Sequence, residues 1–156
     1  KSLGMENGAI LDAQITASSE FDGNHAATQG RLNFLAVPGK AGSWSARTND
    51  VNQWIQVKLP GYTKITRFAT QGRNAFNQWV KQYKLEYSED GVSFHYYHEP
   101  GQSAAKVLRR LQRYNNTNNL FSDALKLIIH ILGATRRQQG ASLKCFSNVL
   151  VLVMSA

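Results

Sequence analysis

Residues 69–88 constrain the fold more than any other part of the 156-residue chain. From residue 79 onward two sets of side chains alternate: Trp79, Lys81, Tyr83, Leu85 and Tyr87 against Val80, Gln82, Lys84, Glu86 and Ser88. Such period-two alternation, rich in aromatic residues, predicts a half-buried antiparallel strand. A second strand-like run occupies residues 63–69, and the polar residues 71–78 between the two runs are too many for a tight hairpin. Because binding groups commonly sit on long polar loops of a rigid sheet, we expect ligand contacts there.

Short strand-like runs recur along the rest of the chain. Residues 14–18, 53–59 and 92–97 have this pattern, and residues 26–33 have the spacing of a short turn of helix. The Asp22-Gly23, Pro60-Gly61 and Asp90-Gly91 pairs mark turns, and we expect Pro60-Gly61 to end the strand over residues 53–59. Many short strands separated by turns predict an antiparallel sandwich or barrel.

Several spaced motifs carry a resemblance to a known family. They are Leu3-Gly4-Met5-Glu6-Asn7-Gly8, Ile15-Thr16-Ala17-Ser18-Ser19, Arg31-Leu32-Asn33, Ser43-Trp44, Gln53-Trp54-Ile55-Gln56-Val57, Thr70-Gln71-Gly72-Arg73, Trp79-Val80 and Tyr83-Lys84-Leu85-Glu86-Tyr87-Ser88-Glu89-Asp90-Gly91. In this order they resemble the discoidin domain, also called the coagulation factor V and VIII type C domain. The match is colinear over residues 1–107 and degrades afterwards.

The resemblance implies an all-β fold, a jelly-roll-like antiparallel β-sandwich of the discoidin or galactose-binding-like type. Ligand loops would protrude from one end of the sandwich. By position these loops would be residues 21–25, 34–40 and 73–78. We expect residues 1–156 to form a single domain, with residues 146–156 as an atypical apolar tail.

The last third of the chain departs from the family pattern. Residues 103–113 have the spacing of a basic amphipathic helix, whereas the family has a strand and a turn there, and we follow the family. Residues 129–132 resemble its late buried strand and residues 142–144 its closing strand. Arg136 stands where the family usually has a tryptophan.

Cys145 is the single cysteine, so no intrachain disulfide can form. The resemblance implies a disulfide between the ends of the domain, with one partner just before Lys1. No run reaches the roughly 18 apolar residues of a membrane span, and no signal peptide is present. Because the chain begins almost directly on the first family motif, we expect a mature or excised module. The resemblance implies an extracellular location, either secreted or in the ectodomain of a larger protein.

The net charge of +8 is unevenly distributed. Residues 1–105 contain 10 Lys/Arg and 9 Asp/Glu, whereas residues 106–156 contain 8 Lys/Arg and one acid, Asp123. A basic patch favours acidic partners such as anionic lipid, sulfated glycan or nucleic acid. The alternative is a solvated basic face without a dedicated ligand.

The sequence gives no indication of an enzyme. No serine lies in a nucleophile turn, and Cys145 has no neighbours that would activate a thiol. His95 and His98 would point to opposite faces of a strand, which disfavours a zinc site. We expect no cofactor, although Asp22 and nearby carbonyls could hold calcium, as in some family members.

The three tryptophans Trp44, Trp54 and Trp79 lie in or at strand-like runs. Core packing is the favoured interpretation, because aromatic side chains dominate core energetics. Stacking on a carbohydrate would require exposed rings.

The candidate site consists of side chains on the three expected loops. Asp22, Asn24, His25, Arg73, Asn74 and Asn77 would contact a cell-surface glycan or an extracellular-matrix protein, because carboxylate, amide and guanidinium groups suit sugar hydroxyls. Alternatively, Phe34, Leu35 and Phe76 would insert into an anionic phospholipid membrane such as phosphatidylserine, with Lys40 and Arg73 as phosphate partners. In a third interpretation Phe34 and Phe76 fold back into the sandwich and the polar groups are merely solvated.

We therefore predict a non-enzymatic extracellular binding and cell-adhesion module, lectin-like in its ligand. A nucleic-acid partner is disfavoured, because the basic residues of the last third lack interleaved aromatics apart from Tyr114. Asn115-Asn116-Thr117 is an N-glycosylation pattern, which has meaning if the protein is secreted.

Overall fold

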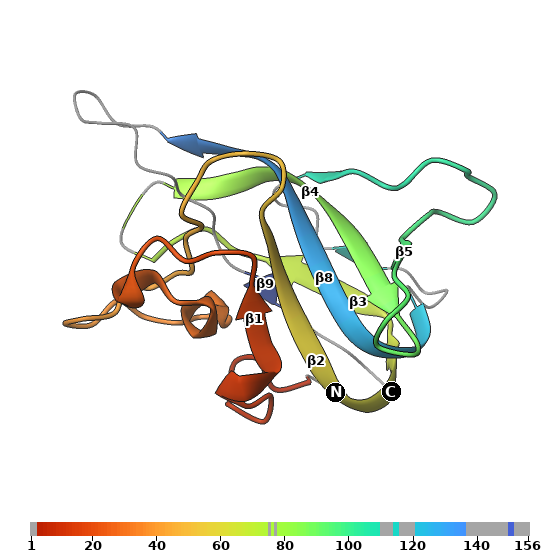
Figure 1. The fold of residues 1–156 in the computed structure, drawn as a ribbon, viewed down its shortest axis with the longest axis horizontal. Helices are drawn as coiled ribbons and strands as arrows, with labels where there is room; N and C mark the ends of the chain where they lie inside the picture. The colour runs from red at the N-terminus through yellow and green to blue at the C-terminus, as the bar shows by residue number, and fades with distance from the viewer. Residues whose placement is uncertain are drawn as a thin grey trace.

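The computed structural model describes residues 3–74, 76, 78–109, 114–115, 121–136 and 150–151. Within them, antiparallel strands form two sheets that pack as a sandwich (Figure 1). The larger sheet has the order β1-β2-β8-β4-β5, with β6 also paired to β4, and the smaller has the order β7-β3-β9. The strands are β1 (Ile15–Ala17), β2 (Trp54–Ile65), β3 (Arg67–Thr70), β4 (Gln78–Ser88), β5 (His95–Tyr96), β6 (Leu108–Arg109), β7 (Tyr114–Asn115), β8 (Phe121–Arg136) and β9 (Leu150–Val151). The predicted all-β sandwich is confirmed.

The strongest strand prediction is confirmed in β4, with one change of phase. Tyr83 and Leu85 point into the core and Lys84 and Glu86 lie on the other face, as the alternation predicts. The register with β8 shifts between Val80 and Gln82, so that Val80 is buried. A β-bulge inserts one residue into a strand and so reverses the faces of the residues before it. The alternation alone would place Lys81 on the same face as Tyr83 and Leu85, but the bulge leaves Lys81 exposed.

The prediction that Pro60-Gly61 ends a strand is wrong. β2 continues through this pair to Ile65, with a register shift between Lys58 and Thr63 where it pairs with β8. Proline lacks an N–H and is tolerated in a sheet where the ladder is interrupted. The irregular segment therefore accommodates Pro60 without breaking the strand.

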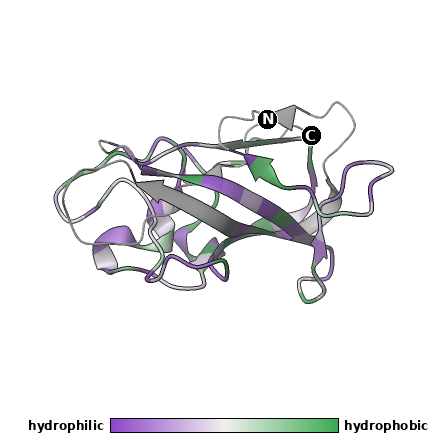
Figure 2. Cartoon of the chain, turned by 90° about the horizontal axis from the view of Figure 1, so that it is seen from above, coloured by the Kyte–Doolittle hydropathy of each residue, from purple (hydrophilic) through white to green (hydrophobic). Residues whose placement is uncertain are grey.

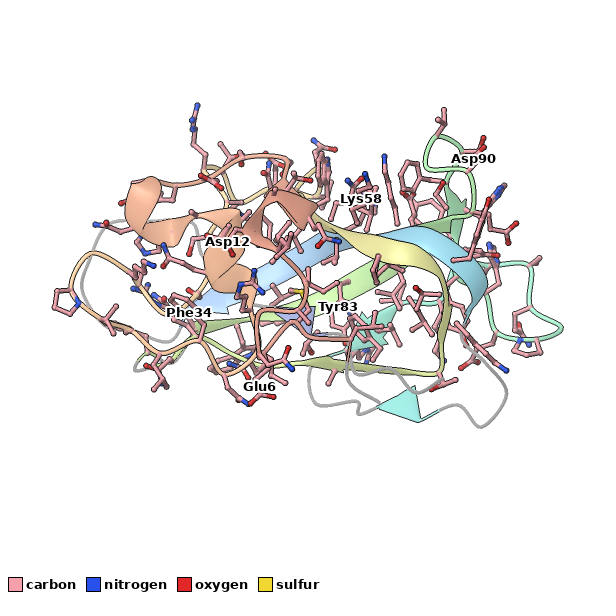
Figure 3. All side chains as sticks on the ribbon, turned by 90° about the horizontal axis from the view of Figure 1, so that it is seen from below. Glu6, Asp12, Phe34, Lys58, Tyr83 and Asp90 are labelled. Carbon is pink, nitrogen blue, oxygen red and sulfur yellow. The ribbon has the colours of Figure 1, made fainter. Side chains whose placement is uncertain are left out.

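The chain passes from one sheet to the other after Ile65. Residues 63–69, expected as one run, divide into the end of β2 and most of β3. Phe68 of β3 then faces Tyr83 of β4, with ring centroids 5.4 Å apart. Figure 3 shows Tyr83 on one side of the large sheet and Lys58 on the other. The first side faces the core and the second is the outer face.

The core fills the space between the two sheets and extends under the N-terminal segment. It contains Met5, Ile10, Ile15, Trp44, Ile55, Val57, Leu59, Ile65, Phe68, Tyr83, Leu85, Tyr97 and Leu108. Polar and apolar residues follow one another along the described strands in Figure 2, as expected for strands with one buried face. Trp44 is fully buried, and its indole N–H donates to the Ser19 carbonyl at 2.9 Å. Trp54 and Trp79 are only partly buried, so core packing describes Trp44 best.

The remaining element predictions have mixed outcomes. The helical turn is present as the 3-10 helix η3 (Ala27–Gly30), alongside η1 (Asp12–Gln14) and η2 (Gly23–His25). The strand expected over residues 92–97 is shorter and is β5. Described residues 103–109 contain β6 and no helix, in agreement with the family pattern, and residues 129–132 lie in β8. Residues 142–144, Cys145 and all of the apolar tail except β9 lie outside the described residues.

Candidate functional site at the loop end

Three segments that are distant in sequence meet at one end of the sandwich, which we call the loop end: residues 21–25, residues 34–42 and the described residues 71–74, 76 and 78. Backbone hydrogen bonds and side-chain bridges join them. The Ala41 N–H donates to the Asn24 carbonyl at 2.8 Å, and the Arg73 guanidinium Nε donates to the Ala41 carbonyl at 3.0 Å. Figure 1 shows these segments at the left of the molecule, beyond the ends of the strands. The sequence-predicted loops are therefore brought together.

The first segment is organised by Asp22, which caps η2. Its Oδ1 accepts from the Asn24 N–H at 2.9 Å and from the His25 Nδ1 at 2.6 Å. The hydrogen bond from His25 lowers the pKa of the Asp22 carboxyl. His25 lies edge-on to Phe21, and its buried Nε2 has no hydrogen-bond partner in the described part of the chain. One carboxylate thus fixes both the helical turn and the imidazole.

The second segment presents apolar side chains on a tight turn. Val37 and Lys40 exchange two backbone hydrogen bonds, at 3.0 and 2.9 Å, around Pro38 and Gly39. Gly39 has φ +78°, the value that a type II turn requires at its third position. Because this short turn cannot bury its flanking residues, Val37 remains exposed, as does Leu35 nearby.

Phe34 and Lys40 interact across the base of this turn. The Lys40 ammonium lies over the half-buried Phe34 ring, 5.9 Å from its centroid. Cation–π attraction therefore holds the lysine close to the apolar turn.

The third segment is built around Arg73. Its Nη1 donates to the Gln78 side-chain oxygen at 2.8 Å, and its guanidinium lies over the Phe76 ring at 4.2 Å from the centroid. Burial lowers the pKa of Arg73 from its ordinary value, and the charge of Asp22 opposes this shift. Two of its nitrogen groups are used within the protein, whereas Nη2 makes no hydrogen bond within the described residues. Arg73 thus links the second segment, through Ala41, to the third, through Gln78.

Asn74 and Gly42 bring the second and third segments into contact. The Asn74 side-chain oxygen accepts from the Ala36 N–H at 3.1 Å. A Cβ on Gly42 would lie 3.0 Å from the Ala36 nitrogen and 3.1 Å from the Asn74 Cβ. Only glycine allows so close an approach at φ +71°.

Gln29 is an organising residue that the sequence analysis did not select. Its buried side chain accepts from the Ala41 N–H at 2.8 Å and donates to the Gly23 carbonyl at 3.3 Å. The amide therefore ties the first segment to the second from below. No local pattern marks it, because its role depends on contacts with residues distant in sequence.

The ten predicted site residues divide into three groups. The exposed ones are Asp22, Asn24, Leu35, Lys40 and Phe76. His25, Phe34, Arg73 and Asn74 are partly buried and hold the segments together. Asn77 lies outside the described residues. The interpretation that the two phenylalanines fold back is wrong for Phe76, which is 49% exposed, and fits the half-buried Phe34 better.

The described residues contain no group of three or more His, Cys, Asp or Glu side chains that could hold a metal ion. Calcium near Asp22 stays a prediction. Among the described residues, no helix has the length and apolar character needed to cross a membrane.

Solved structures share this fold at low sequence identity. Discoidin II from Dictyostelium discoideum has a TM-score of 0.62 at 22% identity, covering 78% of this chain and 49% of that one. CpGH89CBM32-5 from Clostridium perfringens, in complex with GalNAc-β-1,3-galactose, has a TM-score of 0.55 at 19% identity, covering 98% and 99%. At these identities the likeness concerns the fold.

The sequence relatives are closer. Lactadherin from Rattus norvegicus is 37% identical over 125 residues, covering 76% of this chain and 29% of that protein. EGF-like repeat and discoidin I-like domain-containing protein 3 from Homo sapiens is 40% identical over 112 residues, covering 69% and 23%. The chain thus spans less than a third of the length of these relatives. The family model for the F5/8 type C domain matches residues 14–126, beyond residue 107 and into β8. The chain belongs to the F5/8 type C, or discoidin, domain family.

Proposed function

We propose that this chain is a non-enzymatic extracellular binding module, and that its loop end recognises a cell-surface glycan or an extracellular-matrix protein. One observation carries the proposal. The Asn24 carbonyl, in the turn that Asp22 caps, accepts from the Ala41 N–H, while Arg73 donates to the Ala41 carbonyl and lies over the half-exposed Phe76 ring. A carboxylate, a guanidinium and an aromatic ring are thus gathered on one rigid rim.

Each of these groups has atoms left for a ligand. The side-chain amide of Asn24 is exposed and has no hydrogen-bond partner in the described part of the chain. Within the described residues, Oδ2 of Asp22 and Nη2 of Arg73 also make no hydrogen bond. Sugar hydroxyls pair with such donors and acceptors, and the apolar face of a pyranose packs on an aromatic ring such as Phe76.

A glycan array and a collagen-coated plate test this proposal, with the wild-type chain compared with Asn24→Ala. We expect binding to at least one ligand and a loss of roughly fivefold in affinity for Asn24→Ala, corresponding to one hydrogen bond. Because Asn24 is exposed, its truncation leaves the fold intact. Val92→Ala, at an exposed position in the turn that follows β4, is the control. Blank results on both surfaces would contradict the proposal.

A second candidate ligand is an anionic phospholipid membrane, favoured by the exposed apolar side chains. Leu35, Val37 and Phe76 are 65%, 52% and 49% exposed at the same end of the molecule. Lys40 stands beside them and could meet a lipid phosphate. Apolar tips flanked by cations are typical of peripheral membrane insertion.

Sedimentation with phosphatidylserine vesicles tests the membrane interaction. We expect Leu35→Ala combined with Phe76→Ala to weaken partitioning by roughly tenfold or more, because each truncation removes about 1 kcal/mol or more of apolar transfer free energy. Val92→Ala is a matched control, since Val92 is 81% exposed and lies in the Asp90 turn, at the opposite end in Figure 3. Equal losses in the double variant and the control would argue against insertion at the loop end.

We also propose a glycosylation site and a calcium site, both suited to an extracellular protein. Asn115, whose backbone pairs with Arg67 between β7 and β3, would carry an N-linked glycan in a secreted protein. Calcium would bind near Asp22, and isothermal titration with Asp22→Asn as the control tests this.

A further inference from the structure

The outer face of the large sheet carries a second arrangement of side chains, away from the loop end. The strand register sets directly opposed residues in rows, and opposed residues lie on the same face. One row contains Trp54, His130 and Lys84, and the next contains Gln56, Ile128, Glu86 and Tyr96. A third contains Lys58, Lys126 and Ser88, and Gln82 with Arg109 forms the row beyond Lys84. Lys58, Tyr96 and Arg109 in these rows are exposed, whereas Ile128 and Ser88 are buried.

Cations from four strands share this face: Lys58, Lys84, Lys126 and Arg109. Lys58 and Arg109 are exposed, and Lys84 and Lys126 are partly exposed. Lys58 and Lys126 are directly opposed across β2 and β8. Like charges in direct cross-strand opposition destabilise a sheet, and the Lys126 ammonium is held at the end of its row by the Gly91 carbonyl.

The acid in these rows, Glu86, is already engaged within the sheet. Its Oε2 lies 2.8 Å from the His130 Nε2, and the Tyr96 ring packs edge-on against the His130 ring, with centroids 5.8 Å apart. Lys84 lies over the Tyr96 ring, 5.2 Å from its centroid. Glu86 is therefore engaged by His130, and at the register positions above no other carboxylate faces the lysines.

We propose that this outer face binds a sulfated polysaccharide chain. Four cations in successive rows match the repeated negative charges of such a chain, and the aromatic side chains of Trp54 and Tyr96 can pack against sugar rings. Rows lie about 7 Å apart along a strand, so the cations extend over roughly 20 Å, the length of several sugar units. This surface is separate from the loop end and does not depend on the function proposed there.

A membrane or a nucleic acid fits this face less well. The apolar tips suited to lipid insertion are Leu35, Val37 and Phe76, which lie at the loop end. Trp54 is partly buried within its row, so it offers less of its ring than a stacking base requires. A sulfated glycan needs cations in rows and only partial ring contact.

The test is binding of the full chain to a size-defined heparin oligosaccharide, measured by calorimetry at two salt concentrations. We expect Lys58→Gln with Lys84→Gln to weaken binding by roughly fivefold or more, because each exposed ion pair contributes a factor of about two or more. Arg47→Gln with Lys64→Gln removes the same net charge from exposed positions outside these rows and should change affinity by less than about twofold. Lys126 is left intact because its ammonium donates to the Gly91 carbonyl at 2.7 Å.

Several outcomes would overturn the proposal. They are absence of heparin binding at low salt, equal losses in the two double variants, or equal binding of desulfated heparin. If Lys58→Gln with Lys84→Gln lost binding to phosphatidylserine vesicles or to single-stranded DNA but kept its binding to heparin, the face would be assigned to the lipid or the DNA instead. Near-ultraviolet circular dichroism confirms that each variant is folded. Phe76→Ala should retain heparin affinity, which separates this surface from the loop end.

Discussion

Single residues at the loop end bond mainly to one another. Asp22 caps η2 and holds His25, Arg73 bridges Ala41 and Gln78, and Asn74 accepts from Ala36. Substituting Arg73 would change the loop geometry as well as any ligand contact. Exposed residues whose side chains make no such bonds within the described residues, such as Asn24 and Leu35, are therefore better positions at which to test binding without changing the fold.

Gly42 offers the sharpest test of this packing. Gly42→Ala should lower the free energy of unfolding by about 2–4 kcal/mol, since it combines a left-handed φ with contacts near 3 Å to Ala36 and Asn74. Gly39→Ala is the matched control, because Gly39 also has a left-handed φ but no atoms within 4 Å of a Cβ there. It should cost only about 1 kcal/mol. Urea denaturation of both variants measures the difference, and equal losses would refute the close approach of the two segments.

At the level of elements, the turn between β4 and β5 depends on one carboxylate. Asp90 Oδ1 accepts from the N–H groups of Val92 and Ser93, both at 2.7 Å, and from the Ser88 hydroxyl at 3.0 Å. These hydrogen bonds hold the pKa of Asp90 well below its ordinary value. Lys126 closes the turn from β8 through the Gly91 carbonyl.

The lowered pKa predicts how stability depends on pH. A carboxyl whose pKa is depressed by folding contributes stability above about pH 4 and loses it as pH falls toward the folded-state pKa. The unfolding free energy of the wild-type chain should therefore decrease below about pH 4. Asp90→Asn should be less stable than the wild type at neutral pH, and its unfolding free energy should change less as the pH falls below about 4. Chemical denaturation from pH 2 to 7 measures this. Glu89→Gln, which alters a neighbouring exposed acid, should retain the wild-type pH profile.

At the scale of the whole molecule, the two sheets share one core. Phe68 and Tyr83 meet between them, and Leu85 and Leu108 are almost completely buried beside this contact. The loop end and the outer face are thus two surfaces of one sandwich. Ligands could bind to each without changing the other.

A shared core predicts one cooperative unfolding transition for residues 1–156. Leu85→Ala should lower the melting temperature by roughly 5–15 °C, because truncating a buried leucine costs about 2–5 kcal/mol. Far- and near-ultraviolet circular dichroism should report the same midpoint in both proteins. Lys81→Ala, at an exposed position of the same strand, should melt close to the wild type. Separate midpoints would show that the chain folds as more than one unit.

The alternation over residues 79–88 and the turn pairs were enough to predict an antiparallel sandwich or barrel, and the family resemblance carried by the spaced motifs added the jelly-roll-like sandwich and the three loops at one end. These features are local, because side-chain period and turn chemistry reflect the geometry of a few neighbouring residues. The bulge at Val80 and Gln82 and the passage of β2 through Pro60 were not predictable in this way. Both depend on register with β8, which lies more than 40 residues away.

The sequence by itself therefore determined the fold class and the residue types at the loop end. Tertiary structure decided what those residues do: Arg73 and Asn74 became clamps, Gln29 acquired a role that no pattern marks, and Phe76 remained exposed. It also assembled the cations of four strands on one face, since each strand contributes only one of them. The physical reason is that hydrogen bonds and charges act through space, between groups that only the folded chain brings within a few ångströms.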